Sequence, residues 1–265
     1  MTGIAATFAH QLSVALKGAD APTNPVTDDV SAWLERFRAA LDGVGDAEDN
    51  SDTPVKLPAE PGDWLRIACD ELDGLPALVS AIHVAASAGY WYQIYAADGD
   101  PTGISDDPMK ELASGMYATQ MIGPRGLIKS AELLAGLFLL RPRLHYPLHQ
   151  HQATEIYFGA SGTVQIQHGL GQGEGTLGPG QVSLTPSNRL HALTVGDSPV
   201  LLLYTWMGEL GGRNWWWHQS GEGVWQRDAW ERQPNAAWAK TVTEVLSPEH
   251  IAIGEEGIDL GRDLR

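Results

Sequence analysis

The feature that most constrains the fold is residues 127–206, where short apolar runs alternate with turns rich in Gly and Pro. The runs are four to eight residues long and include EIYF, TVQIQ and VLLLYTW. Residues 163–167 alternate polar and apolar side chains, as a half-buried strand does. Regular short strands separated by turns are typical of an antiparallel sandwich or barrel. We therefore expect a mainly β fold.

Two flanking regions complete the predicted organisation. The predicted parts are a helical N-terminal region at 1–122, a β-barrel at 123–210 and a Trp-rich C-terminal wrap at 211–265. Helical spacing of apolar residues and helix-start signals predict helices at 1–45, about 75–88, about 106–119 and near 234–246. An acidic stretch rich in Pro and Gly, at about 46–62, is predicted to be a solvated linker.

Composition excludes several classes of partner. Lys and Arg number 17 against 33 Asp and Glu, so the formal net charge is −16. Nucleic acids and anionic membranes are bound through Lys and Arg, so we expect neither as a partner. A small cationic or zwitterionic molecule is attracted instead. The single cysteine, Cys69, excludes an intramolecular disulfide and a cysteine-based zinc cluster.

The sequence also predicts where the chain resides. No segment has the ~18–20 consecutive apolar residues of a membrane helix. Residues 1–18 lack the basic start of a secretory signal, since Lys17 follows the apolar stretch rather than preceding it. We expect a cytoplasmic protein.

Four side chains in the strand-rich region form a candidate metal site: His149, His151, Glu155 and His191. In a straight strand His151 and Glu155 would lie about 13 Å apart, at ~3.3 Å per residue. Ligands of one metal must lie within ~2.0–2.2 Å of it, so the chain is expected to bend between these two residues. His191 follows a Pro-Ser-Asn turn and opens the next apolar run.

Three imidazoles and one carboxylate suit one divalent transition metal ion, such as Fe(II), Zn(II) or Mn(II). The identity of the metal is left open, and Co and Ni also accept this set. A His-x-His pair alone is more often an ordinary strand feature, so the prediction depends on the whole set. His145 and His168 are predicted not to be ligands.

The spacing of these residues resembles the two motifs of the cupin family. The matching patterns are His149-x-His151-(x)3-Glu155-(x)6-Gly162 and Gly180-(x)5-Pro186-(x)4-His191. The chain departs from the motifs in three places. Arg143 and Asn188 stand where glycine is usual, and Val195 stands where asparagine is usual. None of the three is a ligand, so only the turn geometry is left open. The resemblance implies a single double-stranded β-helix, or jelly-roll, barrel.

A narrower resemblance links residues 146–157, His191 and residues 203–208 to the cupin-type dimethylsulfoniopropionate (DMSP) lyases. It implies a helical region before one cupin barrel, and a metal-dependent β-elimination that releases dimethyl sulfide and acrylate. We expect Tyr157, which shares the strand parity of Glu155, to be the base, and Tyr146 to be a positioning or auxiliary residue. Trp206 and Tyr204 are candidates for binding the sulfonium over their ring faces. For each of these aromatic residues the alternative is simple packing in the barrel wall.

Two other functions remain open at this point. One is a cupin metalloenzyme with another small substrate, for example an Fe(II) dioxygenase or an isomerase. The other is a non-catalytic cupin that senses a metal or small ligand. The expected partner is a small zwitterionic substrate, and a homodimer is also considered. The tryptophans at 215–217 cannot all face the same way, and the group at 215–238 is expected on the outside of the barrel or at an interface.

Overall fold

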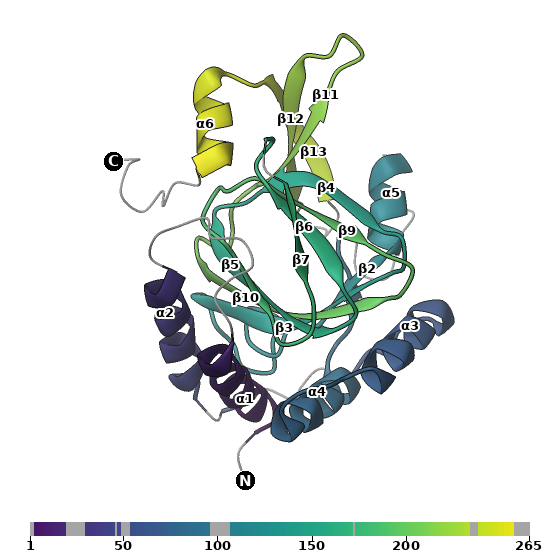
Figure 1. Ribbon diagram of the computed structural model, residues 1–265, viewed down its shortest axis with the longest axis vertical. Helices are drawn as coiled ribbons and strands as arrows, with labels where there is room; N and C mark the ends of the chain where they lie inside the picture. Colours follow the sequence, from purple (N-terminus) through teal and green to yellow (C-terminus); the bar gives the residue numbers. More distant parts are fainter. Residues whose placement is uncertain are drawn as a thin grey trace.

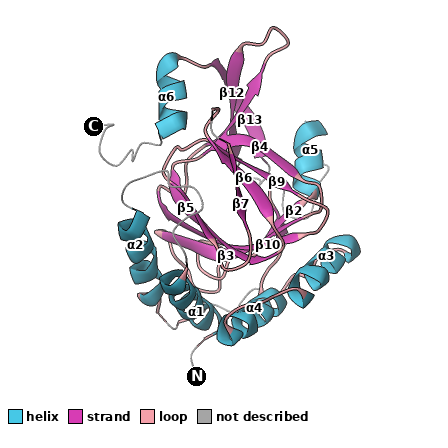
Figure 2. Ribbon diagram, viewed as in Figure 1, coloured by secondary structure: helices cyan, strands magenta, loops and turns pink. Residues whose placement is uncertain are grey.

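The structure is a computed structural model that describes residues 3–19, 30–45, 47–48, 54–95, 107–171, 173–233 and 238–256. Two antiparallel sheets close into a jelly-roll barrel of the cupin type, with the first four helices gathered against one side (Figures 1 and 2). The six-stranded sheet has the order β1 (Tyr92–Gln93), β2 (Met116–Ala118), β3 (Leu133–Leu140), β10 (Val200–Gly208), β5 (Ala153–Ser161), β8 (Val182–Thr185). The seven-stranded sheet has the order β13 (Trp238–Val245), β12 (Trp225–Arg232), β11 (Asn214–Gln219), β4 (His145–Gln150), β9 (His191–Val195), β6 (Val164–His168), β7 (Glu174–Leu177). The mainly β, cupin-type fold expected from the sequence is confirmed.

Strands β3 and β10 are apolar on both faces, and this follows from their position between two layers. Leu137 and Leu203 pack in the same core as the N-terminal helices. Their neighbours Phe138 and Tyr204 belong to the separate core inside the barrel. Because successive side chains of a strand point to opposite faces, a strand buried on both sides needs an uninterrupted apolar run.

Four helices cover the outer face of the six-stranded sheet (Figure 1). They are α1 (Ile4–Gly18), α2 (Val30–Asp42), α3 (Ala59–Asp70) and α4 (Pro76–Ala88). The predicted helical segment 1–45 thus contains two helices, and residues 20–29 between them lie outside the described residues. The predicted linker at 46–62 is too long, because α3 already begins at Ala59. Glu60 in its first turn favours a helix start there.

The helix predicted at 106–119 is shorter in the structure. Helix α5 spans Asp107–Ser114, and the chain then forms β2, which pairs with β3. Residues 116–118 are buried against that strand. Tertiary pairing has therefore overridden the local helical pattern.

The helix predicted near 234–246 is wrong. Residues 238–245 form β13, which pairs antiparallel with β12, and the helix of this region, α6, spans Pro248–Glu256. Thr241, Val242, Thr243 and Val245 are β-branched residues, which fit a pleated strand better than a helix. Residues 234–237 lie outside the described residues.

Two of the departures from the cupin motifs keep the backbone that glycine would adopt. Arg143 and Asn188 both have φ of 59°, in the left-handed region. Asparagine visits this region more readily than most residues, whereas arginine does so at a cost. The backbone N–H of Asn188 donates to the carbonyl of His151 at 2.8 Å, which fixes this turn next to the candidate metal site. Both turns thus have a backbone conformation that glycine adopts without steric cost.

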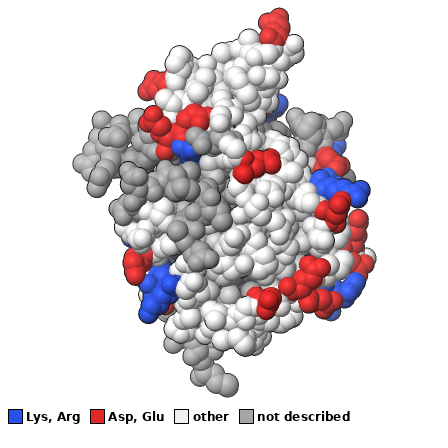
Figure 3. Space-filling model, viewed as in Figure 1, with Lys and Arg blue, Asp and Glu red and all other residues white. Residues whose placement is uncertain are grey.

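Charge on the surface is mixed. On the face shown in Figure 3, Lys and Arg side chains lie near Asp and Glu rather than gathered in a patch. Among the described residues, no helix combines the length and the apolar character that crossing a membrane requires.

Candidate metal centre and cavity

The chain crosses from one sheet to the other around His151, between His149 and Glu155. Strand β4 of the seven-stranded sheet ends at Gln150, and β5 of the six-stranded sheet begins at Ala153. This crossing brings Nε2 of His151 to 3.4 Å from Oε2 of Glu155, where a straight strand would hold them far apart. His191, at the start of β9, is the register partner of His149 in β4. Its Nε2 also lies 3.4 Å from Oε2 of Glu155. The structure thus brings all four predicted ligands together.

Backbone carbonyls orient the three imidazole rings. Each histidine donates from Nδ1 to a carbonyl oxygen two residues away in the chain. The pairs are His149 with Pro147 at 2.8 Å, His151 with Ala153 at 3.0 Å and His191 with Arg189 at 3.0 Å. A carbonyl oxygen only accepts, so Nδ1 carries the hydrogen, and Nε2 of each neutral ring keeps a lone pair. This is the arrangement in which outer hydrogen bonds orient a metal-binding histidine.

The histidine nitrogens that do not bond to backbone carbonyls lie close together, next to the Glu155 carboxylate. Ligand atoms of His149, His151 and His191 all lie within 4.8 Å of one another. Nε2 of His151, Nε2 of His191 and Oε2 of Glu155 are buried and have no hydrogen-bond partner. Buried polar atoms without partners are costly, and a cation at their centre would satisfy them together. Nitrogen and oxygen donors in this number suit a divalent transition metal ion.

The charge states of these groups also suit metal binding. Burial would raise the pKa of Glu155, but the close approach of His151 and His191 to its carboxylate outweighs burial and lowers that pKa to about 2. Burial, followed by charge interactions with the neighbouring histidines, lowers the pKa of His149 well below its ordinary value. Burial likewise lowers the pKa of His191. A carboxylate and neutral imidazoles are the forms that bind metals.

Trp206 fixes the orientation of Glu155. Its indole Nε1 donates to Oε1 of Glu155, which leaves Oε2 facing the histidines. The same indole stacks on the ring of His151, with 4.1 Å between the centroids. Trp206 therefore contacts two candidate ligands, a role that the sequence did not predict for it.

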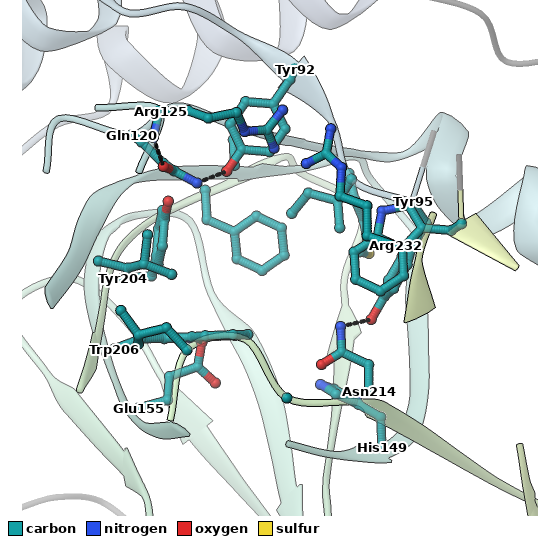
Figure 4. Close-up of a pocket in the computed structure, with 18 of the residues that line it drawn as sticks. Tyr92, Tyr95, Gln120, Arg125, His149, Glu155, Tyr204, Trp206, Asn214 and Arg232 are labelled. Atoms are coloured by element: carbon teal, nitrogen blue, oxygen red, sulfur yellow. Dashed lines mark hydrogen bonds between the residues drawn. The ribbon is translucent and has the colours of Figure 1, made fainter. Parts of the chain in front are cut away.

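The ligand cluster lies at one side of a cavity of about 590 Å³ inside the barrel (Figure 4). His149 and Glu155 reach the cavity wall, whereas His151 and His191 are not part of it. The four predicted aromatic residues also line the cavity: Tyr146, Tyr157, Tyr204 and Trp206. All eight residues singled out in the sequence therefore belong to the cavity or the adjacent cluster.

The three tyrosines differ in their contacts. Tyr157 is buried beside Glu155 and stacks on Phe138 with 5.9 Å between ring centroids. Tyr146 lies face to face with the ring of His149 at 3.7 Å. The hydroxyl of Tyr204 donates to the backbone carbonyl of Thr119 at 3.1 Å. Burial raises the pKa of all three hydroxyls well above the ordinary value.

The two histidines predicted not to be ligands lie outside the cluster. His145 is exposed, and its Nδ1 is 3.0 Å from the hydroxyl of Thr194. His168 is buried at the end of β6, where its Nε2 is 2.9 Å from the hydroxyl of Thr185.

Sequence reasoning missed several residues of the cavity wall. Tyr95 and Asn214 line the cavity, and they form a hydrogen-bonded group next to Tyr146 together with Trp216, which is not part of the wall itself. On another part of the wall, Arg125 lies over the ring of Tyr92 at 4.1 Å (Figure 4). None of these residues stands in a motif, and the sequence offered only one signal. Successive side chains of a strand point to opposite faces, so the middle one of the three consecutive tryptophans must point away from the other two. That middle residue is Trp216.

The fold is a barrel of two antiparallel sheets, and three histidines and one glutamate cluster inside it. These features define a cupin with a site suited to a metal ion. Comparison with known proteins narrows this class. A family model described as dimethylsulfoniopropionate lyase matches residues 98–202. The resemblance to the cupin-type DMSP lyases seen in the motifs is thereby confirmed, and the chain is similar to this family over that part of its length.

Individual relatives agree with the family match. The chain is 37% identical over 90 residues to dimethylsulfoniopropionate lyase DddQ of Ruegeria pomeroyi, and 31% identical over 101 residues to the protein DddL of Cereibacter sphaeroides. These alignments cover 34% and 37% of this chain, and the chain spans only 44% and 41% of the length of these relatives. The crystal structure of DMSP lyase DddQ from Ruegeria pomeroyi aligns over 72% of this chain and 95% of its own. The TM-score is 0.51 and the identity 25%.

Proposed function

We propose that the protein is a metal-dependent lyase that cleaves DMSP by β-elimination into dimethyl sulfide and acrylate. The observation that carries the proposal is the position of Tyr157, which lines the cavity beside the Glu155 carboxylate of the metal-binding cluster. The relatives named as DMSP lyases support the same reaction. A β-elimination requires one base and a means of stabilising negative charge next to a carboxylate, and this cavity offers both.

The proposed roles of the residues follow from their contacts. Tyr157 removes the proton α to the substrate carboxylate, since its hydroxyl faces the same space as Glu155. Tyr146, stacked on His149, lies where it can position the substrate next to the cluster. Loss of dimethyl sulfide from the β-carbon then completes the double bond of acrylate, and the α-proton remains on the phenol.

The cluster of His149, His151, Glu155 and His191 is proposed to hold one divalent ion, with Fe(II), Zn(II) and Mn(II) as the candidates. When bound, such an ion supplies positive charge that stabilises the developing charge on the carboxylate and favours the phenolate form of Tyr157. Without it, burial and the nearby Glu155 carboxylate hold the pKa of Tyr157 well above its ordinary value. The base therefore depends on a cation in the cluster.

The sulfonium end of the substrate is assigned to the aromatic part of the wall. Tyr204 and Trp206 line the cavity from the same strand, β10, two residues apart. A cation over an aromatic face gains roughly 0.5–2 kcal/mol. Because Trp206 also donates to Glu155, it links the sulfonium region to the metal-binding cluster.

Anaerobic release of dimethyl sulfide tests the proposal. Protein loaded in turn with Fe(II), Mn(II), Co(II), Ni(II) or Zn(II) is incubated with DMSP without oxygen, and the headspace is analysed by gas chromatography. We expect dimethyl sulfide from the wild type. Tyr157→Phe should lose at least about 100-fold in rate, as expected for a general base, while it still binds metal. Tyr117→Phe, a change in the core outside the cavity, is the matched control and should remain active.

Each negative result contradicts a separate part of the proposal. No dimethyl sulfide with any of the five metals rules out the lyase activity. An undiminished rate for Tyr157→Phe rules out this tyrosine as the base. The main alternative, an Fe(II) dioxygenase, requires oxygen, so turnover in its absence also separates the two functions.

A further inference from the structure

A second tyrosine hydroxyl lies behind Tyr146. Tyr95, in the turn after β1, is buried and in the left-handed region with φ of 63°. Its hydroxyl is hydrogen-bonded to that of Tyr146, and the two rings meet edge to face at 6.2 Å. This contact joins positions 51 residues apart in the chain.

Two N–H groups of β11 also point at the Tyr95 hydroxyl. Nδ2 of Asn214 donates to it at 3.4 Å and Nε1 of Trp216 at 3.3 Å (Figure 4 shows the bond from Asn214). The indole N–H is only a donor, and a phenol oxygen has two lone pairs and one hydrogen. With both lone pairs of Tyr95 used as acceptors, its own hydrogen is left for the oxygen of Tyr146.

The direction of this bond determines what Tyr146 can do. An oxygen that accepts from Tyr95 must direct its own hydrogen elsewhere, and Tyr146 lines the cavity. Burial raises the pKa of Tyr95 to about 12, so its hydroxyl keeps its hydrogen at neutral pH. We propose that Tyr95, fixed by Asn214 and Trp216, is a positioning residue that holds Tyr146 as a hydrogen-bond donor to a carboxylate ligand in the cavity. The choice of a carboxylate rests on the proposed function.

The C-terminal strands β11 and β13 help to hold Tyr95 in place. Trp216 is the register partner of His149, so its side chain is set beside the cluster. It meets Tyr95 edge to face at 5.1 Å, while Trp238 of β13 contacts the same ring at 4.9 Å. Trp217 faces the opposite side and lies against Gly254 of α6. Part of the tryptophan group expected on the outer surface therefore holds the cavity wall in place.

A double-mutant cycle with acrylate tests the proposal. Acrylate has the carboxylate of the expected product without the sulfonium, and its binding to Zn(II)-loaded protein is measured by calorimetry without turnover. We expect Tyr95→Phe and Tyr146→Phe each to weaken acrylate about five- to tenfold, the effect of one hydrogen bond. Tyr95→Phe should have no further effect when Tyr146 is already Phe, since Tyr95 acts only through it.

The control is Trp230→Phe, which changes packing behind Trp216, at 5.8 Å between rings, without touching the hydrogen bonds. We expect it to leave acrylate affinity unchanged. Additive losses in the cycle, or equal losses in the control, would show a general packing effect and overturn the proposal. Failure of the wild type to bind acrylate would overturn it as well.

A crystal structure of wild-type protein with acrylate is an independent test that needs no variant to fold. We expect the hydroxyl of Tyr146 within about 3 Å of a carboxylate oxygen. Acrylate bound away from Tyr146 contradicts the proposal. The lyase assay remains separate. Coupling without release of dimethyl sulfide contradicts only the proposed function, and release without coupling contradicts only the role of Tyr95.

Discussion

Replacing Trp206 by Phe isolates one hydrogen bond to the candidate metal-binding cluster. The indole N–H donates to Oε1 of Glu155, a carboxylate that is 1% exposed. Phe keeps an aromatic ring in contact with His151 but has no donor. Glu155 then keeps its charge while losing the group that turns its Oε2 toward the histidines.

Two independent estimates agree on the free energy that is lost when this donor is removed. A hydrogen bond to a charged group contributes about 1.5–3 kcal/mol. Loss of an outer partner of a metal ligand costs about 10–100-fold in metal affinity, or about 1.4–2.7 kcal/mol. We therefore expect Trp206→Phe to weaken Zn(II) binding by about 10–100-fold.

Competition with a chromophoric chelator at pH 7.5 measures this affinity directly. Trp230→Phe is the matched control, since it makes the same replacement at a buried tryptophan that does not line the cavity. We expect the control to bind Zn(II) as the wild type does. Equal affinity in wild type and Trp206→Phe would refute the reasoning, because it would mean that Glu155 needs no orientation by the indole.

Three further predictions concern stability. Free Zn(II) at 100 times its Kd should stabilise the protein by about 2.7 kcal/mol, seen as a higher Tm that a chelator reverses, and His191→Ala should abolish the effect. Arg143→Gly should raise stability by about 0.5–1 kcal/mol in urea unfolding, because it relieves a positive φ, while the exposed pair with Asp197 contributes little. Burial would raise the pKa of Asp228, but a hydrogen bond from a threonine and the Lys240 ammonium lower it. Its contribution is therefore present above about pH 4 and lost as pH falls below, so the destabilisation of Asp228→Asn, about 1 kcal/mol at pH 7, should disappear in acid unfolding.

The core of the fold and the proximity of the four candidate metal ligands were predictable because they depend on short-range patterns. The spacing of His149, His151 and Glu155 requires a bend for the three to meet, and the structure supplies it where the chain changes sheets. The apolar runs of β3 and β10 predict strands because so many consecutive apolar residues need two buried faces.

The errors arose where a distant partner decides the local structure. Residues 116–118 and 238–245 are strands because β3 and β12 pair with them, and no signal within those segments names the partner. The group around Tyr95 was missed for the same reason. Its bond to Asn214 spans 119 residues, and Asn214 lies in the segment 211–265, which was expected to wrap around the barrel.

The net charge of −16 is a poor guide to the ligand, because the cavity has a different balance. Among the described residues, the cavity wall holds three arginines, Arg125, Arg213 and Arg232, against two glutamates, Glu155 and Glu231. Charges on the distant surface are screened over about 8 Å at physiological ionic strength, so the lining matters more than the total. A divalent ion beside Glu155 would make the wall more positive still. A ligand with a carboxylate as well as a cationic group therefore fits this cavity better than a simple cation does. The net charge alone had favoured these two kinds of ligand equally.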